Sequence, residues 1–176
     1  REHTSIVGVP KFIPAYAGLR LQKEIETLTK VIENPQKPLV IIIGGAKIES
    51  KKPVIDKFLE KAEKILIGGK IGLDWEGEIP SKVILPVDYA NHNYDIGPKT
   101  TDLFGDHLKI AKTVIWAGPL GMFEEDEYFK GTKRIANKIA QITKNNGCFS
   151  LIGGGDTVAA IKKADVQNEM SFVSTG

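Results

Sequence analysis

The sequence lacks the features that place a chain in a membrane, outside the cell or on nucleic acid. Only one of its 176 residues is cysteine, Cys148, so no internal disulfide can form and a reducing, cytoplasmic compartment is expected. No apolar run approaches the length of a membrane span, and the first residues carry no signal-peptide pattern. Because 24 Lys and Arg face 22 Asp and Glu, the net charge is only +2, and we expect neither nucleic acid nor a membrane as partner.

The two commonest nucleotide-binding signatures are also absent. No Lys-Ser or Lys-Thr follows a spaced glycine pair, as a P-loop would require. Gly153-Gly154-Gly155 are consecutive and lack the later glycine of the dinucleotide fingerprint. Any nucleotide that binds here must therefore use a less common arrangement.

Short apolar runs that end in glycine recur along the chain. Because these runs are unbroken rather than alternating, each predicts a strand buried on both faces of a sheet. Segments with apolar residues at helical spacing lie between them, and Pro53 is expected in the first turn of one. The alternation predicts an α/β fold, doubly wound, with a mainly parallel sheet of about six strands and helices on both faces. The predicted strands are 38–43, 64–67, 83–87, 113–116, 148–152 and 171–173, the helices 21–32, 53–62, 100–111, 135–142 and 157–163, and the irregular stretches 70–82 and 89–97.

Four glycine clusters are predicted at the carboxyl edge of this sheet, where such folds bind ligands. A single glycine turn is explained by tight strand-to-helix geometry alone. Four at one edge favour a phosphate ligand, because backbone N–H groups and helix N-termini attract anions.

Charged residues follow three of these turns, and each has two interpretations. Lys47 and Lys51 follow Gly44-Gly45, either as phosphate contacts or as a solvated basic turn. Asp156 either caps the helix that begins near it or acts on Mg²⁺, with Thr157 holding phosphate oxygens. Glu124 either accepts hydrogen bonds from a ribose or is solvated, and Phe123 either lines a base pocket or anchors its loop.

Taken together, these segments resemble the phosphoglycerate kinase family. The similarity lies in Gly44-Gly45-Ala46-Lys47 with Lys51, in 116–124, in Gly153-Gly154-Gly155-Asp156-Thr157, and in shorter matches. The shorter matches are 95–100, 131–133, 174–176 and Arg1-x-His3-x-Ser5, and all occur in family order along nearly the whole chain.

The resemblance implies the nucleotide-binding half of a two-lobed glycolytic kinase, with MgADP or MgATP as ligand. Residues 1–15 would be an interdomain segment and 16–176 the nucleotide-binding (C-terminal) domain, cut short at its end. The missing N-terminal lobe would hold 3-phosphoglycerate or 1,3-bisphosphoglycerate, with Arg1 in its basic patch, and the protein would be a monomer. Lys47 and Gly154 would act in catalysis and Asp156 on the metal. The implied nucleotide-binding residues are Gly45, Lys47, Lys51, Gly69, Gly118, Pro119, Phe123, Glu124, Gly154, Gly155, Asp156 and Thr157.

Three departures from the family pattern keep other functions open. Ala117 stands where the family usually has Asn, Lys70 where it usually has a third Gly, and the stretch between Gly69 and Asp95 is short. One alternative is a catalytically degenerate binding or scaffolding domain that kept the fold. A weaker alternative is an unrelated α/β nucleotide-binding enzyme, such as another transferase.

Overall fold

The computed structural model describes residues 3–174, so Arg1, for which we expect a substrate role, lies outside the described residues. The chain divides into two compact units, Arg1–Pro35 and Gln36–Gly176. The expected boundary between residues 15 and 16 stays a prediction.

The first unit contains short turns followed by one long helix. This helix ends before Asn34, as the sequence predicts, but its predicted apolar stripe is wrong in part. Leu21, Ile25 and Ile32 are exposed, whereas Val31 is buried. The elements are η1 (Thr4–Gly8), η2 (Val9–Lys11) and α1 (Leu19–Glu33).

The second unit is built on one parallel sheet of six strands in the order β3-β2-β1-β6-β7-β8. Every neighbouring pair in it is parallel, which confirms the predicted doubly wound sheet. All five residues of β1 are buried, as an unbroken apolar run predicts. The strands are β1 (Leu39–Ile43), β2 (Lys64–Ile67), β3 (Val83–Ile84), β6 (Thr113–Ala117), β7 (Phe149–Gly153) and β8 (Phe172–Ser174).

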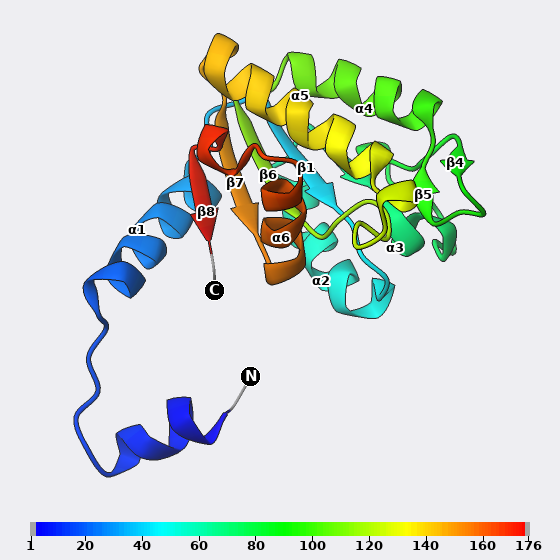
Figure 1. Ribbon diagram of the computed structural model, residues 1–176. Helices are drawn as coiled ribbons and strands as arrows, with labels where there is room; N and C mark the ends of the chain where they lie inside the picture. Colours follow the sequence, from blue (N-terminus) through cyan, green and yellow to red (C-terminus); the bar gives the residue numbers. More distant parts are fainter. Residues whose placement is uncertain (1–2, 175–176) are drawn as a thin grey trace. The chain divides into compact units, whose positions relative to one another are not determined.

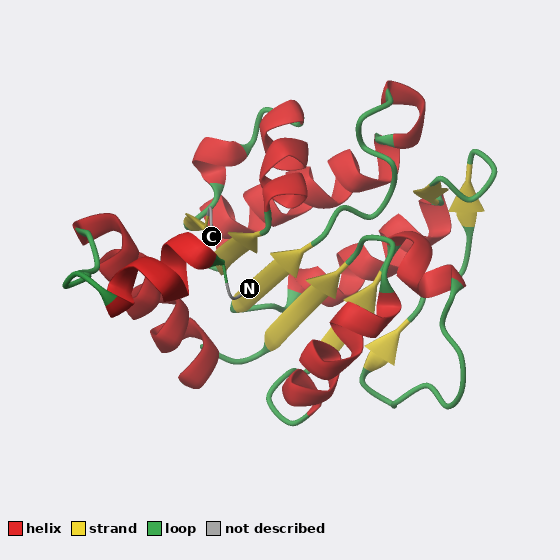
Figure 2. Ribbon diagram, turned by 90° about the horizontal axis from the view of Figure 1, so that it is seen from below, coloured by secondary structure: helices red, strands yellow, loops and turns green. Residues whose placement is uncertain are grey.

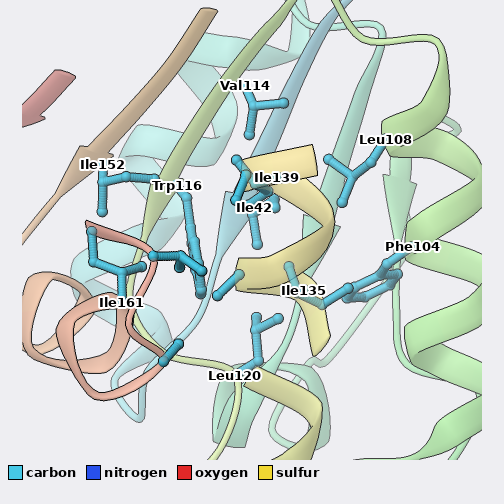
Figure 3. Packing of buried hydrophobic residues seen from close by; sticks show 14 of the residues in the cluster. Ile42, Phe104, Leu108, Val114, Trp116, Leu120, Ile135, Ile139, Ile152 and Ile161 are labelled. Atoms are coloured by element: carbon cyan, nitrogen blue, oxygen red, sulfur yellow. The ribbon is translucent and has the colours of Figure 1, made fainter. Parts of the chain in front are cut away.

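Helices of this unit lie on both faces of the sheet (Figures 1 and 2). One face is covered by α4, α5 and α6, whose buried residues join the strands in one hydrophobic cluster. In Figure 3, Trp116 and Val114 of β6 point toward Ile135 and Ile139 of α5. The α2 helix lies on the opposite face and contacts β2. The helices are α2 (Ile48–Leu59), α3 (Gly69–Leu73), α4 (Pro98–Lys109), α5 (Lys130–Asn146) and α6 (Gly155–Lys163), with single turns η3 (Asp126–Tyr128) and η4 (Gln167–Glu169).

Several local predictions differ from the structure. The α2 helix begins at Ile48, so Pro53 lies inside it rather than in its first turn, and Ile55 instead of Val54 is the buried residue. Proline is disfavoured inside a helix because it lacks an amide N–H, which made Pro53 a misleading start signal. The stretch 70–82 contains most of α3, and 83–87 contributes only two residues to β3.

The stretch 89–97 contains a small antiparallel hairpin, formed by β4 (Tyr89–Ala90) and β5 (Asp95–Ile96). Its turn holds three consecutive non-glycine residues in the left-handed region, Asn91, His92 and Asn93, with φ of 51°, 59° and 70°. Two-residue strands carry no detectable periodicity, so the sequence offers no signal for this hairpin.

Asp88 caps the start of α4 from outside the helix. Its Oδ2 accepts the Lys99 N–H at 3.0 Å, and its Oδ1 accepts the Thr100 N–H at 2.6 Å and the Thr100 hydroxyl at 2.7 Å. Burial acts to raise the pKa of Asp88, but the hydrogen bonds from Thr100 and Lys99 outweigh it and keep the pKa below its usual value. The ionised carboxylate therefore stabilises this helix end.

We expect Asp88→Ala to lower the free energy of unfolding by about 1–2 kcal/mol, since it removes a cap with several hydrogen bonds. Urea unfolding followed by circular dichroism measures this, with Asp102→Ala on the exposed side of α4 as control. Because the folded-state pKa of Asp88 is lowered, the difference from wild type is present at neutral pH. It should shrink as pH falls below about 4, through the folded-state pKa. Equal stability of both variants at pH 7 would contradict the capping role.

Candidate functional site

The strand order reverses at the boundary between β1 and β6. Chain order runs outward from β1 to β2 and β3 on one side, and from β6 to β7 and β8 on the other. In open α/β sheets, such a switch point leaves a crevice outside the carboxyl ends of the strands. The predicted site segments follow β1, β2, β6 and β7 and therefore share this edge.

Two glycines let the turns after β1 and β6 approach each other closely. A Cβ on Gly44 would collide with the carbonyl oxygens of Pro119 and Gly118, and a Cβ on Gly118 would collide with the carbonyl of Gly44. Gly118 also has a φ of +96°, which other residues rarely adopt. These glycines are therefore needed for backbone packing, whatever ligand binds.

Most of the glycine amides that the sequence offers to a phosphate donate inside the protein. Gly44 N–H donates to Ala117 O at 3.0 Å, Gly45 N–H to Pro119 O at 2.9 Å, and Gly69 N–H to Leu120 O at 3.1 Å. Gly118 N–H donates to the Thr157 hydroxyl at 2.7 Å. The turns of β1, β2 and β6 are thus tied to one another and to α6.

The N-terminus of α6 is different. Gly154, with a φ of +91°, precedes this nine-residue helix without a side-chain cap. Among the described residues, none accepts a hydrogen bond from the amides of Gly155, Asp156 or Thr157. These amides and the positive end of the helix dipole favour an anion beside the carboxyl end of β7.

A cavity of about 530 Å³ lies at this edge and is lined from four strand ends and from the β4–β5 hairpin. Its walls combine apolar side chains with a few charged groups, as ligand sites usually do. The lining residues are Gly45, Ala46, Gly69, Lys70, Leu73, His92, Asn93, Tyr94, Pro119, Gly121, Met122, Phe123, Glu124 and Asp156.

Half of the residues expected to bind nucleotide line this cavity, namely Gly45, Gly69, Pro119, Phe123, Glu124 and Asp156. The others lie beside it. Lys47 is exposed at the N-cap of α2 and Lys51 follows one turn later. The strands β1 and β7 are separated only by β6, so Lys47 and Asp156 follow strand ends about 10 Å apart at one edge. Gly118, Gly154, Gly155 and Thr157 flank the cavity without lining it, and Thr157 is fully buried.

The hairpin wall was missed by sequence reasoning. Tyr94 is 48% exposed and lines the cavity, and its carbonyl accepts the Met122 N–H at 2.9 Å. Its ring lies 5.0 Å from that of Tyr128, and Asn91 Nδ2 donates to Glu127 O at 2.5 Å. The only sequence signal for Tyr94 was its position directly before the 95–100 motif. His92 is exposed and also lines the cavity.

The buried carboxylate of Asp95 links the β4–β5 hairpin to the start of α5. Asp95 accepts the Gly131 N–H at the start of α5 at 2.6 Å and the Ile96 N–H at 2.9 Å. Burial raises the pKa of Asp95 to about 6, although these hydrogen bonds and nearby Lys130 act to lower it. Gly121 and Gly131 leave room for its oxygens, because a Cβ on either would collide with the carboxylate.

The fold and the site define a doubly wound α/β protein with a ligand crevice at its topological switch point. The family model for phosphoglycerate kinase matches residues 1–75 and 79–176. The chain therefore belongs to the phosphoglycerate kinase family.

Individual relatives agree with this assignment. Phosphoglycerate kinase from Thermosipho africanus is 36% identical over all of this chain and 56% of the relative, and that from Malacoplasma penetrans is 37% identical over all of this chain and 47% of the relative. The crystal structure of phosphoglycerate kinase from Pyrococcus horikoshii is 25% identical with a TM-score of 0.82, and covers all of this chain and 56% of its own. The chain spans about half the length of the curated relatives it matches.

The family match is interrupted in the stretch between Gly69 and Asp95. The alignment with the Thermosipho protein runs over 226 positions although this chain has 176 residues, so the relative carries residues that this chain lacks. The interruption of the family match lies at 76–78. Here α3 follows β2 directly and places Lys70 and Leu73 on the cavity wall.

We expect Gly44→Ala to destabilise the protein by more than about 2 kcal/mol, because backbone carbonyls at the switch point have nowhere to move. Gly105→Ala is the matched control, since a Cβ there meets nothing within 4 Å inside α4. It should stabilise the chain by about 0.5–1 kcal/mol. Urea unfolding of both variants measures the two changes in the free energy of unfolding, which should have opposite signs. If Gly44→Ala left this free energy unchanged, the close packing of the turns after β1 and β6 would be refuted.

No helix among residues 3–174 is long and apolar enough to cross a membrane.

Proposed function

We propose that this chain is the nucleotide-binding half of a phosphoglycerate kinase, and that MgADP or MgATP occupies the cavity at the switch point. The observation that carries the proposal is the convergence of four separate motifs on one cavity. Gly45, Gly69, Glu124 and Asp156 follow four different strands, yet all line the same space. Random placement of these motifs would not bring a ribose-binding carboxylate and a phosphate-binding helix end together.

The phosphates of the nucleotide would lie at the α6 end of the cavity. The amides of Gly155 and Asp156 are available there, and the helix dipole favours negative charge. Lys47 at the N-cap of α2 and Lys51 in its first turns would neutralise the charge of the phosphates. Lys47 would act on the phosphoryl group that is transferred. Gly154 would present its backbone to that same group.

The residues present fit a magnesium ion bound with the nucleotide. Within 3–174, no group of three or more His, Cys, Asp or Glu residues is arranged to hold a metal by itself. Mg²⁺ is usually held by one or two carboxylates together with substrate phosphates, and Asp156 lines the cavity at the phosphate end. Asp156 would hold the ion, which supplies neutralising charge to the phosphates when bound.

The base and ribose would lie at the apolar end. Leu73, Met122 and Tyr94 line the cavity, and the ring of Tyr94 packs against that of Tyr128. A half-exposed aromatic ring that is already ordered stacks a flat base at small entropic cost. Glu124 is exposed at the same wall and would accept hydrogen bonds from the ribose hydroxyls.

The reaction would be phosphoryl transfer between 1,3-bisphosphoglycerate and ADP, giving 3-phosphoglycerate and ATP in cytoplasmic glycolysis. Such transfer depends on positioning and charge neutralisation, and a carboxylate acceptor is already ionised, so no general base is required. The phosphoglycerate would be held by an N-terminal lobe with Arg1 in its basic patch. We therefore expect this chain alone, as a monomer, to bind nucleotide without turnover.

A catalytically degenerate binding domain is the second candidate. Two observations favour it: Ala117 ends β6 beside Gly118, where the family usually has Asn, and Lys70 lines the cavity, where the family usually has Gly. Lys70 is paired with Asp74 at 2.5 Å, so its ammonium is held at the rim. Robust ATP formation from 1,3-bisphosphoglycerate by the full-length protein would exclude degeneracy, and nucleotide binding without turnover would support it.

Isothermal titration of the chain with ADP and Mg²⁺ tests nucleotide binding directly. We expect measurable binding for the wild type and a loss of about tenfold or more for Asp156→Asn, since a charged hydrogen-bonding group is removed. The loss should shrink in EDTA, because Asp156 is proposed to act through the metal. Asp102→Asn on α4 should bind like wild type. No heat at millimolar ADP would overturn the proposal.

A further inference from the structure

The loop 118–129 carries five cavity-lining residues and is held by α6 at both ends of that helix. At the helix start, the Thr157 hydroxyl accepts the Gly118 N–H at 2.7 Å. At the helix end, Lys163 reaches the far part of the loop. The cavity-lining residues of the loop are Pro119, Gly121, Met122, Phe123 and Glu124.

Lys163 uses all three of its N–H donors on this loop. Its Nζ donates to Phe123 O at 3.0 Å, to Glu124 O at 2.9 Å and to Asp126 Oδ1 at 2.7 Å. The same ammonium lies 5.1 Å from the centroid of the Phe129 ring. The Lys163 side chain is 30% exposed, whereas that of Asp126 is 92% exposed, so solvent and salt screen the ion pair and the hydrogen bonds to the two carbonyls are the main link to the loop.

These contacts hold the backbone of Glu124 and leave its side chain free. Lys163 binds the carbonyl of Glu124, whereas the carboxylate belongs to an exposed residue of the cavity wall. Elsewhere in 121–125, Phe123 N–H donates to Gly121 O and Glu125 N–H to Met122 O within the loop, and Met122 N–H donates to Tyr94 O of the hairpin. Lys163 is therefore the cation that joins this stretch to the helix that begins with Asp156.

We propose that Lys163 is a positioning residue that fixes the ribose-binding carboxylate of Glu124 relative to Asp156, making one rigid nucleotide-binding unit of α6 and its loop. This inference rests on the proposed nucleotide site. Lys163 is not one of the cavity-lining residues and lies at the opposite end of α6 from Asp156, so its link to the site runs through the carbonyls of Phe123 and Glu124. A site held this way loses affinity through misplacement of Glu124 rather than through a lost ligand contact.

Lys163→Met is the main variant, because it keeps an apolar stem beside Phe129 and removes the charge and all three donors. By isothermal titration, we expect the Kd for MgADP to rise about tenfold, which corresponds to a loss of about 1.4 kcal/mol in binding free energy. Lys163→Arg should restore most of the affinity, since guanidinium can reach the same acceptors. Lys162→Met is the matched control, being an exposed neighbour in the same helix turn, and should bind like wild type.

A double-mutant cycle with Glu124→Gln separates positioning from general support of the helix. If Lys163 acts through Glu124, Lys163→Met should cost less than about threefold in the Glu124→Gln background, because the carboxylate is already gone. A full, additive loss there would overturn the inference, as would wild-type affinity of Lys163→Met. If Lys163→Met does not fold by circular dichroism, Lys163→Gln, which keeps one donor group, replaces it in the cycle. Absence of MgADP binding by the wild type would instead refute the proposed site itself.

Discussion

The close approach of the turns that follow β1 and β6 is the constraint on which the site depends. Gly44 and Gly118 lie so close that neither tolerates a Cβ, and the amides of Gly44 and Gly45 donate across the gap. This contact brings together the two halves of the sheet at the point where strand order reverses. Every other wall of the cavity is placed relative to it, since β2, β7 and their helices follow from the register of these two central strands.

The loop after β6 and the start of α5 are held by hydrogen bonds to their backbone. Thr157 and Lys163 bind the loop after β6, and Asp95 binds the start of α5. This leaves Asp156 and Glu124 exposed at the cavity, without an ion-pair partner among the described residues. A carboxylate that is fixed in place but not neutralised is the form in which it can serve a metal or a hydroxyl group.

Sequence reasoning succeeded where a pattern is long and failed where it is short. The runs 38–43 and 113–116 predicted buried parallel strands because β-branched residues fill both faces. The start of α2 was predicted near Pro53, whereas the helix begins at Ile48. The hairpin with Tyr94 was not predicted, because its two-residue strands are too short to show a periodic pattern. The glycine clusters were recognised, but Gly45, Gly69 and Gly118 donate their amides within the protein, which depends on long-range contacts.

The sequence by itself determined the doubly wound fold and the phosphoglycerate kinase motifs, because hydrophobic periodicity and local motifs are written in contiguous residues. Only the tertiary structure decided which motif residues share the cavity and which lie beside it. Lys163 and Tyr94 enter the site region from elements brought near only by chain folding. The physical reason is that hydrogen bonds such as Lys163 to Glu124 link residues far apart in sequence, whose approach no local propensity encodes.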